Sequence, residues 1–376
     1  MLSRACSSLV AGVLVSLWLV ACGDGDASQV DDTSGVSGSS GASGAAGAPE
    51  VDPSTCKTED ECASFRSPPV TPSTPPAGSG PAEGSEHVHA VSALFLGDTD
   101  RQGVESDDAW KLYGFDLDGW SSTPGQGFHC QPKEGGKATR IRVDGPGGID
   151  NAFGQIITPL LAYLVPDTSG VATAGIAKGR ATLLLDLTAL GDASDETGVA
   201  GGLTLAQGSA TAGGTITDWT THAWNPLTGP SSALTGASLI GNRLVASVEG
   251  SLPISIDVGM AAPLAFEVQR ARLQVDLSAD RMNGTSGVLG GVVPTEVMVD
   301  AVARFASFFS SALCGDDSPT LAGLKKEIRA NSDSLMDGTQ DPTRTCDGIS
   351  IGLGFETRQV TKGPPKAPAA PVLPCD

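Results

Sequence analysis

Short β-forming runs separated by Gly, Asn and Asp fill most of the chain between His87 and Lys362. The strongest run, residues 181–190 (ATLLLDLTAL), is apolar enough for a strand that is buried on both faces. The dipeptides Gly241-Asn242 and Asn283-Gly284 each separate two such runs, and both favour the positive φ that a tight hairpin requires. The pattern therefore predicts a β-rich fold that contains at least two hairpins.

Helical periodicity is confined to three segments. Residues 295–313 place Met298, Val302, Phe305 and Phe309 on one stripe, which predicts a helix packed on the sheet. Ser318-Pro319 predicts the start of a second helix that Gly338 ends, and residues 151–164 are the third candidate. We therefore expect a mainly β fold, a β-sandwich or jelly-roll-like domain with two or three peripheral helices.

The domain organisation follows changes in composition. Residues 22–86 are rich in Gly, Ser, Ala and Pro, and they cannot bury enough apolar surface to fold alone. Residues 87–362 form the predicted globular domain, with two sub-domains meeting near residue 170 as the alternative. Residues 363–376 are a Pro-rich tail.

The N-terminus carries the most specific localisation signal. Arg4 precedes the apolar run Leu9–Val20, which is too short for a transmembrane helix and is typical of a secretory signal peptide. The run ends in Leu19-Val20-Ala21-Cys22, which resembles the lipobox of bacterial lipoproteins. The resemblance implies cleavage after residue 21 and acylation of Cys22, including an amide-linked chain such as palmitate. Because Gly23 stands where the inner-membrane retention signal carries Asp, it also implies an outer-membrane lipoprotein that faces the periplasm or the cell surface.

The charge balance excludes one class of partner and characterises the leader. The chain has 23 Lys+Arg against 43 Asp+Glu, a net charge of -20, so a basic nucleic-acid-binding patch is not expected. Residues 23–86 carry 11 acidic and two basic side chains. Self-repulsion extends such a segment, so we expect a tether between the membrane and the folded domain.

Cysteine usage agrees with an exported protein. With Cys6 in the signal peptide and Cys22 acylated, six cysteines remain, an even number that favours disulfides. Cys56 and Cys62 flank a short loop and are expected to pair, and Cys314–Cys346 and Cys130–Cys375 are the other pairs that we expect.

Carboxylates are densest between Gly97 and Gly154, often beside Gly. The candidate metal ligands in this region are Asp98, Asp100, Asp116, Asp118, Asp144 and Asp150. Alternating carboxylates on a turn can direct their oxygens at Ca²⁺, which takes six to eight oxygen ligands. Residues 98–109 do not fit an EF-hand, because Ala109 stands where the bidentate Glu belongs. Turn-forming surface carboxylates are the plainer interpretation, and a calcium ion is the alternative.

No motif identifies a catalytic residue. Residues 348–352 match G-x-S-x-G, but Ile349, Ile351 and Leu353 alternate as in a strand, and no His follows. Trp219 and Trp224 are candidate carbohydrate-stacking residues, although core packing is the plainer interpretation. An envelope-anchored binding or adhesion module, assisted by calcium and recognising a carbohydrate or protein, is therefore favoured over an enzyme. A structural or apolar-ligand-carrying envelope protein is the alternative, and a polymer hydrolase follows it.

Overall fold

A computed structural model describes residues 58–60, 63–66, 84–123, 127–133, 143–209, 214–259, 262–310, 313–314, 318–370 and 375. All of them belong to one compact unit, Val51–Asp376. The strands are β1 (Ser85–Phe95), β2 (Ala181–Leu190), β3 (Glu196–Thr197), β4 (Gly201–Gly208), β5 (Ala223–Pro226), β6 (Ser232–Ile240), β7 (Arg243–Val248), β8 (Ser251–Ile256), β9 (Leu264–Leu277), β10 (Asn283–Pro294), β11 (Gly348–Gln359) and β12 (Thr361–Lys362). The helical segments are η2 (Ala63–Phe65), η3 (Ala109–Leu112), η5 (Phe153–Ile157), α1 (Thr158–Ala162), α2 (Thr168–Ala177), α3 (Thr295–Ser307) and α4 (Pro319–Ala330).

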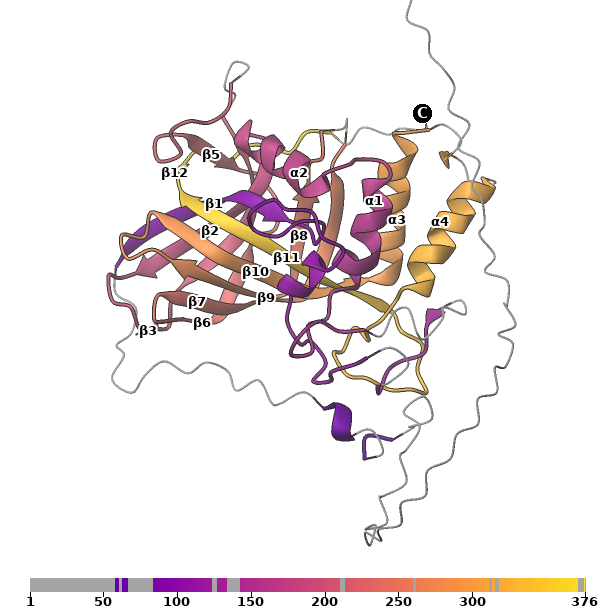
Figure 1. Ribbon diagram of the computed structural model, residues 1–376. Helices are drawn as coiled ribbons and strands as arrows, with labels where there is room; N and C mark the ends of the chain where they lie inside the picture. The colour runs from indigo at the N-terminus through magenta and orange to yellow at the C-terminus, as the bar shows by residue number, and fades with distance from the viewer. Residues whose placement is uncertain are drawn as a thin grey trace, which may run out of the picture. The chain divides into compact units, whose positions relative to one another are not determined.

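Eight strands form a closed antiparallel barrel in the order β4-β2-β1-β11-β10-β9-β7-β6, and β6 pairs with β4 again to close it (Figure 1). The β-sandwich or jelly-roll-like domain that the sequence predicted is therefore wrong. The closing ladder is short and joins Gly202 to Ala233 and Leu203 to Ser232. A Cβ on Gly202 would lie only 3.2 Å from the carbonyl oxygen of Ser232, so glycine permits this approach.

The barrel lumen is packed with leucine side chains. Across neighbouring strands, Leu185 faces Leu203, and Leu289 faces both Leu273 and Leu353. All five line an apolar cavity of only about 40 Å³. The lumen is therefore a filled core, as expected for a small eight-stranded barrel.

Different residues lie at the two ends of the barrel. At the end where β2 begins, Ile254 of β8 and Ile176 of α2 cover the lumen cavity. Beyond the other end of β2, the buried Arg281 donates hydrogen bonds to the carbonyl oxygens of Gly191 (3.2 Å) and Ala193 (2.6 Å). Arg281 therefore joins the β9–β10 turn to the loop after β2.

The predicted helices are found, with shorter bounds. The stripe on α3 is buried at Met298, Val302 and Phe305, but α3 ends at Ser307 instead of Leu313. Ser318 caps α4 as predicted, and α4 ends at Ala330, well before Gly338. The third candidate, residues 151–164, contains η5 and α1. α3 packs against β9, β10 and β11, and also against α4 (Figure 1).

The sequence did not predict α2, whose position depends on side-chain to backbone hydrogen bonds with the end of β1. The hydroxyl of Ser169 accepts a hydrogen bond from the Leu96 backbone N–H (2.8 Å) and donates one to Asp98. Thr173 accepts one from the N–H of Leu94 (3.1 Å). These contacts compensate for a glycine-containing segment of low helix propensity.

Two disulfides join distant segments, Cys130–Cys346 and Cys314–Cys375. The expected pairs Cys314–Cys346 and Cys130–Cys375 are therefore wrong, although all four cysteines are disulfide-bonded. Residue Gln131 pairs with Thr345 in an isolated bridge, and this brings Cys130 beside Cys346. Cys22, Cys56 and Cys62 lie outside the described residues.

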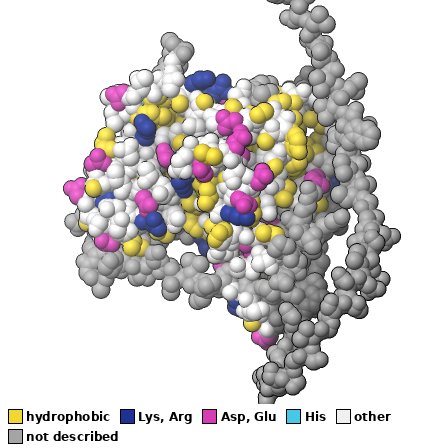
Figure 2. Space-filling model, in the orientation of Figure 1, with side chains coloured by type: hydrophobic (Ala, Val, Ile, Leu, Met, Phe, Trp, Pro, Cys, Tyr) yellow, Lys and Arg dark blue, Asp and Glu magenta, His cyan; other side chains and the backbone are white. Residues whose placement is uncertain are grey.

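The distribution of charged side chains on the surface and the length of the helices bear on binding to nucleic acids and membranes. Figure 2 shows acidic and basic side chains interspersed over the visible face, with no continuous basic patch among its described residues. No helix in the described part of the chain is both long enough and apolar enough to cross a membrane.

Candidate functional site

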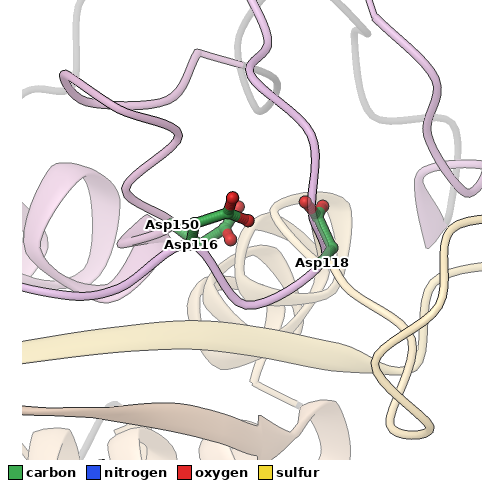
Figure 3. Close-up of side chains that lie close together, drawn as sticks. All are labelled: Asp116, Asp118 and Asp150. Carbon is green, nitrogen blue, oxygen red and sulfur yellow. The ribbon is translucent and has the colours of Figure 1, made fainter. Parts of the chain in front are cut away.

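Three carboxylates from two loops converge beside the barrel. Asp116 and Asp118 follow η3, and Asp150 lies just before η5. If one carboxylate oxygen is taken from each of the three residues, the three oxygens all lie within 4.8 Å of one another. Figure 3 shows that all three side chains belong to loop segments. The backbone N–H of Asp150 donates to the carbonyl oxygen of Phe115 (3.0 Å), which joins the two loops.

Backbone donors hold these carboxylates in place. The N–H of Leu117 donates to Asp150 (2.7 Å), and the N–H of Gly119 donates to Asp116 (2.6 Å). In both carboxylates the second oxygen accepts no hydrogen bond from the described residues. The oxygens of Asp118 accept from the Trp120 N–H (2.8 Å) and from the side-chain amide of Gln340 (2.7 Å).

Two further carboxylates interact electrostatically with this group. Asp144 accepts a hydrogen bond from the N–H of Ser122 (2.6 Å). Asp333, between α4 and β11, accepts one from the N–H of Ser350 (2.8 Å). Repulsion from Asp333 acts on both Asp118 and Asp144. We call the set Asp116, Asp118, Asp144, Asp150 and Asp333 the carboxylate cluster.

Burial raises the pKa values of four members of the carboxylate cluster, and repulsion between carboxylates adds to this for three of them. Burial, with repulsion from Asp116 and Asp333, raises the pKa of Asp118 to about 7. Burial and the charge of Asp118 raise the pKa of Asp144 to about 8. The pKa of the buried Asp150 is raised well above its usual value for the same two reasons, and burial raises that of Asp333 to about 6.

The carboxylate cluster has the chemistry of a cation site. Among the described residues, no Lys or Arg side chain forms an ion pair with any of its five members. Without a cation, the four carboxyls with raised pKa values either take up protons at a higher pH than a free aspartate does or stay charged at a cost in free energy. Two oxygens that each lie about 2.4 Å from a shared Ca²⁺ are at most about 4.8 Å apart. The oxygens of Asp116, Asp118 and Asp150 lie within this limit of one another.

The structure separates the six aspartates that the sequence singled out as candidate ligands. Asp116, Asp118, Asp144 and Asp150 belong to the carboxylate cluster. Asp98 does not, because it accepts hydrogen bonds from the backbone and the hydroxyl of Ser169. Asp100 does not either, because it accepts from the N–H groups of Gln102 (2.8 Å) and Val104 (2.9 Å) within its own turn.

Asp333 and its neighbour Gln340 were missed by the sequence reasoning. They lie about two hundred residues after Asp118 along the chain, in a loop whose composition indicates only the end of a helix. No local signal connects them to the carboxylate cluster.

The two tryptophans proposed for ligand stacking lie together in the core. The rings of Trp219 and Trp224 stack with centroids 5.9 Å apart, and both side chains are buried. Trp224 therefore presents no face to a sugar, and Trp219, which is 8% exposed, contributes only to the lining of one hollow. Ser350 of the G-x-S-x-G segment lies within β11, as the strand interpretation predicted. Its hydroxyl donates to Asp333, a contact that the sequence did not predict.

An open groove of about 510 Å³ lies near the carboxylate cluster. Its lining includes Asp98, Glu105, Asp107 and Asp167 and no Lys or Arg. Tyr163, at its edge, is 88% exposed. None of the carboxylate cluster lines the groove.

Asn151 connects the carboxylate cluster to this groove. It follows Asp150 directly, and its side-chain amide donates to the carbonyl oxygens of Trp110 (3.1 Å) and Tyr113 (3.0 Å). Its side-chain oxygen accepts from the N–H of Gly154 (2.9 Å), a residue that lines the groove. The residue next to Asp150 is thereby hydrogen-bonded to one residue of the groove lining, and also to Gly352 of β11.

The chain matches no family model, no curated protein and no solved structure.

Proposed function

We propose that this protein is a calcium-assisted binding module held at the bacterial cell envelope by a lipid on Cys22. The observation that carries the proposal is the carboxylate cluster, in which five acidic groups gather without a basic partner among the described residues. A bound divalent cation offsets the cost of burying these carboxylates in their charged form and relieves their mutual repulsion.

Calcium suits this cluster better than magnesium. Ca²⁺ accepts six to eight oxygen ligands in irregular geometry, whereas Mg²⁺ demands near-ideal octahedral coordination and retains several waters. Asp116, Asp118 and Asp150 supply carboxylate oxygens from two irregular loops. Water completes the coordination shell of such a site.

The ion assists binding by ordering the groove. Calcium held by Asp150 fixes the start of the segment that continues through Asn151 into Gly154 and η5. Gly154 and Gln155 line the groove, whose exposed Tyr163 and polar rim are suited to a carbohydrate or protein ligand.

The lipobox-like sequence supports the anchor. Acylation of Cys22 attaches several acyl chains, each worth about 0.8 kcal/mol per buried CH₂, which gives stable attachment to the outer membrane. The acidic residues 23–86 then hold the barrel away from the lipid headgroups. Labelled palmitate should enter the wild-type chain in bacteria and should not enter Cys22→Ser, and equal labelling of both would refute the anchor.

Two other functions receive less support. The lumen cavity of about 40 Å³ is far below the roughly 300–1,000 Å³ of a typical ligand pocket, so an apolar-ligand carrier is not favoured. Carboxylates with raised pKa values also occur in hydrolases. None of the carboxylate cluster lines the lumen cavity or the groove, so a substrate would lack access through either.

Hydrogen exchange on the full chain tests calcium-assisted ordering. Adding Ca²⁺ to metal-free protein should slow amide exchange in residues 143–163, and Asp150→Asn should abolish the effect. Asp300→Asn, at an exposed position on α3, is the matched control and should behave as wild type. Calcium-independent exchange in this segment of the wild type would contradict the proposal.

A further inference from the structure

A second concave site lies on the outer side of the barrel, away from the groove. The loop before β5, the β9–β10 hairpin and the end of β11 enclose a hollow of about 240 Å³. It is lined by Thr217, Asp218, Trp219, Thr220, Met282, Asn283, Arg358 and Gln359. Unlike the groove beside Tyr163, its lining contains a cationic side chain, Arg358.

The exposed side chain of Arg358 lies over an aromatic pair. Its guanidinium lies 5.8 Å from the ring centroid of Trp219, and Trp219 stacks in turn on the fully buried Trp224. Among the described residues Arg358 forms no ion pair with a carboxylate. A guanidinium positioned on an aromatic ring keeps its planar fork of N–H donors, which matches a carboxylate.

The surrounding side chains are suited to hydroxyl groups. The side-chain amides of Asn283 and Gln359 form no hydrogen bond with the described residues, and each offers donors and an acceptor. Asp218 is held by hydrogen bonds from the hydroxyls of Thr220 (2.7 Å) and Thr221 (2.8 Å). Its negative charge disfavours a compact dianion such as phosphate, whereas its oxygens can still accept from a ligand hydroxyl.

We propose that this hollow binds a hydroxyl-rich ligand that carries one carboxylate, the chemistry of a uronic acid residue in an acidic polysaccharide. Arg358 pairs with the carboxylate, and Asn283, Gln359 and Asp218 bond the ring hydroxyls. The volume accommodates a unit of about one sugar ring. The site adds a ligand class to the proposed binding function but does not depend on calcium, so either proposal can fail without the other.

Isothermal titration of the full chain with a galacturonic acid trimer tests the proposal. Saturable binding is expected, with affinity at least about tenfold weaker for Arg358→Gln and intermediate for Arg358→Lys, which keeps the charge but loses the fork. Lys326→Gln, which removes an exposed charge on α4, is the matched control and should bind as wild type. EDTA should not change the affinity.

Three results would overturn the assignment. The first is no saturable binding of the trimer at about 10 mM. The second is equal binding of a neutral glucose trimer or of inorganic phosphate, which would show that the carboxylate and the hydroxyls are not recognised together. The third is unchanged trimer affinity in Arg358→Gln whose circular dichroism matches wild type.

Discussion

Replacing Asp118 with Asn should have opposite effects on stability in the absence and presence of calcium. In the metal-free protein at pH 8, Asp118 is mostly ionised although its folded-state pKa is raised from 3.8 to about 7. One pKa unit corresponds to about 1.4 kcal/mol, so ionised Asp118 lowers the free energy of unfolding by roughly 2–4 kcal/mol. Asn removes this charge and can still accept the Trp120 N–H.

We therefore expect Asp118→Asn to raise the melting temperature of the metal-free protein by several degrees, at roughly 2 °C per kcal/mol. In saturating Ca²⁺ the same variant should melt below wild type, because the ion has lost a ligand. Differential scanning calorimetry of the full chain in EDTA and in Ca²⁺ measures both effects, with Asp300→Asn as the control. A lower melting temperature in EDTA together with an undiminished calcium response would refute the reasoning.

Three further outcomes follow from burial and covalent linkage. First, the metal-free protein should become more stable as the pH falls from 9 to 6.5, because Asp118 and Asp144 take up protons in the folded state at raised pKa values of about 7 and 8. Chemical denaturation at several pH values measures this change in the free energy of unfolding. Calcium should make the free energy of unfolding depend less on pH. Second, burial, with repulsion from His87 and Arg281, lowers the pKa of His89 to about 4. Because the unfolded chain takes up this proton at a higher pH than the folded protein, the free energy of unfolding should fall by about 3 kcal/mol between pH 6.5 and pH 4. The difference in unfolding free energy between wild type and His89→Gln should therefore vary with pH over that interval, and a constant difference would contradict it. Third, replacing both Cys130 and Cys346 with Ala removes a disulfide that spans 216 residues and should lower the free energy of unfolding in urea by about 5 kcal/mol, and a loss below about 1 kcal/mol would show that the disulfide does not constrain the unfolded chain.

Local patterns predicted the elements of the barrel better than their closure. Gly241 and Asn242 form the turn between β6 and β7, and both have the positive φ that the sequence predicted for a tight hairpin. The second hairpin joins β9 to β10 as predicted, but its turn precedes Asn283, which is the first residue of β10. Closure depends on the short ladder between β4 and β6, and periodicity along one strand carries no information about such a pairing.

The candidate site was predicted only in part, because local sequence patterns do not show which distant residues the fold brings together. Asp116, Asp118, Asp144 and Asp150 lie within one acidic stretch, so their clustering could be anticipated. Asp98 lies in that stretch too, but it binds Ser169 of a helix that the sequence did not predict. Asp333 reaches the cluster only through the tertiary fold, as does the Cys130–Cys346 pair.

Titration of calcium into the metal-free full chain tests the central claim most directly. The account predicts one site per chain with a dissociation constant on the order of 10⁻³ M or tighter, lost or strongly weakened in Asp118→Asn and unchanged in Asp300→Asn. The absence of such binding, or equal binding by Asp118→Asn and wild type, would contradict a calcium site in the carboxylate cluster.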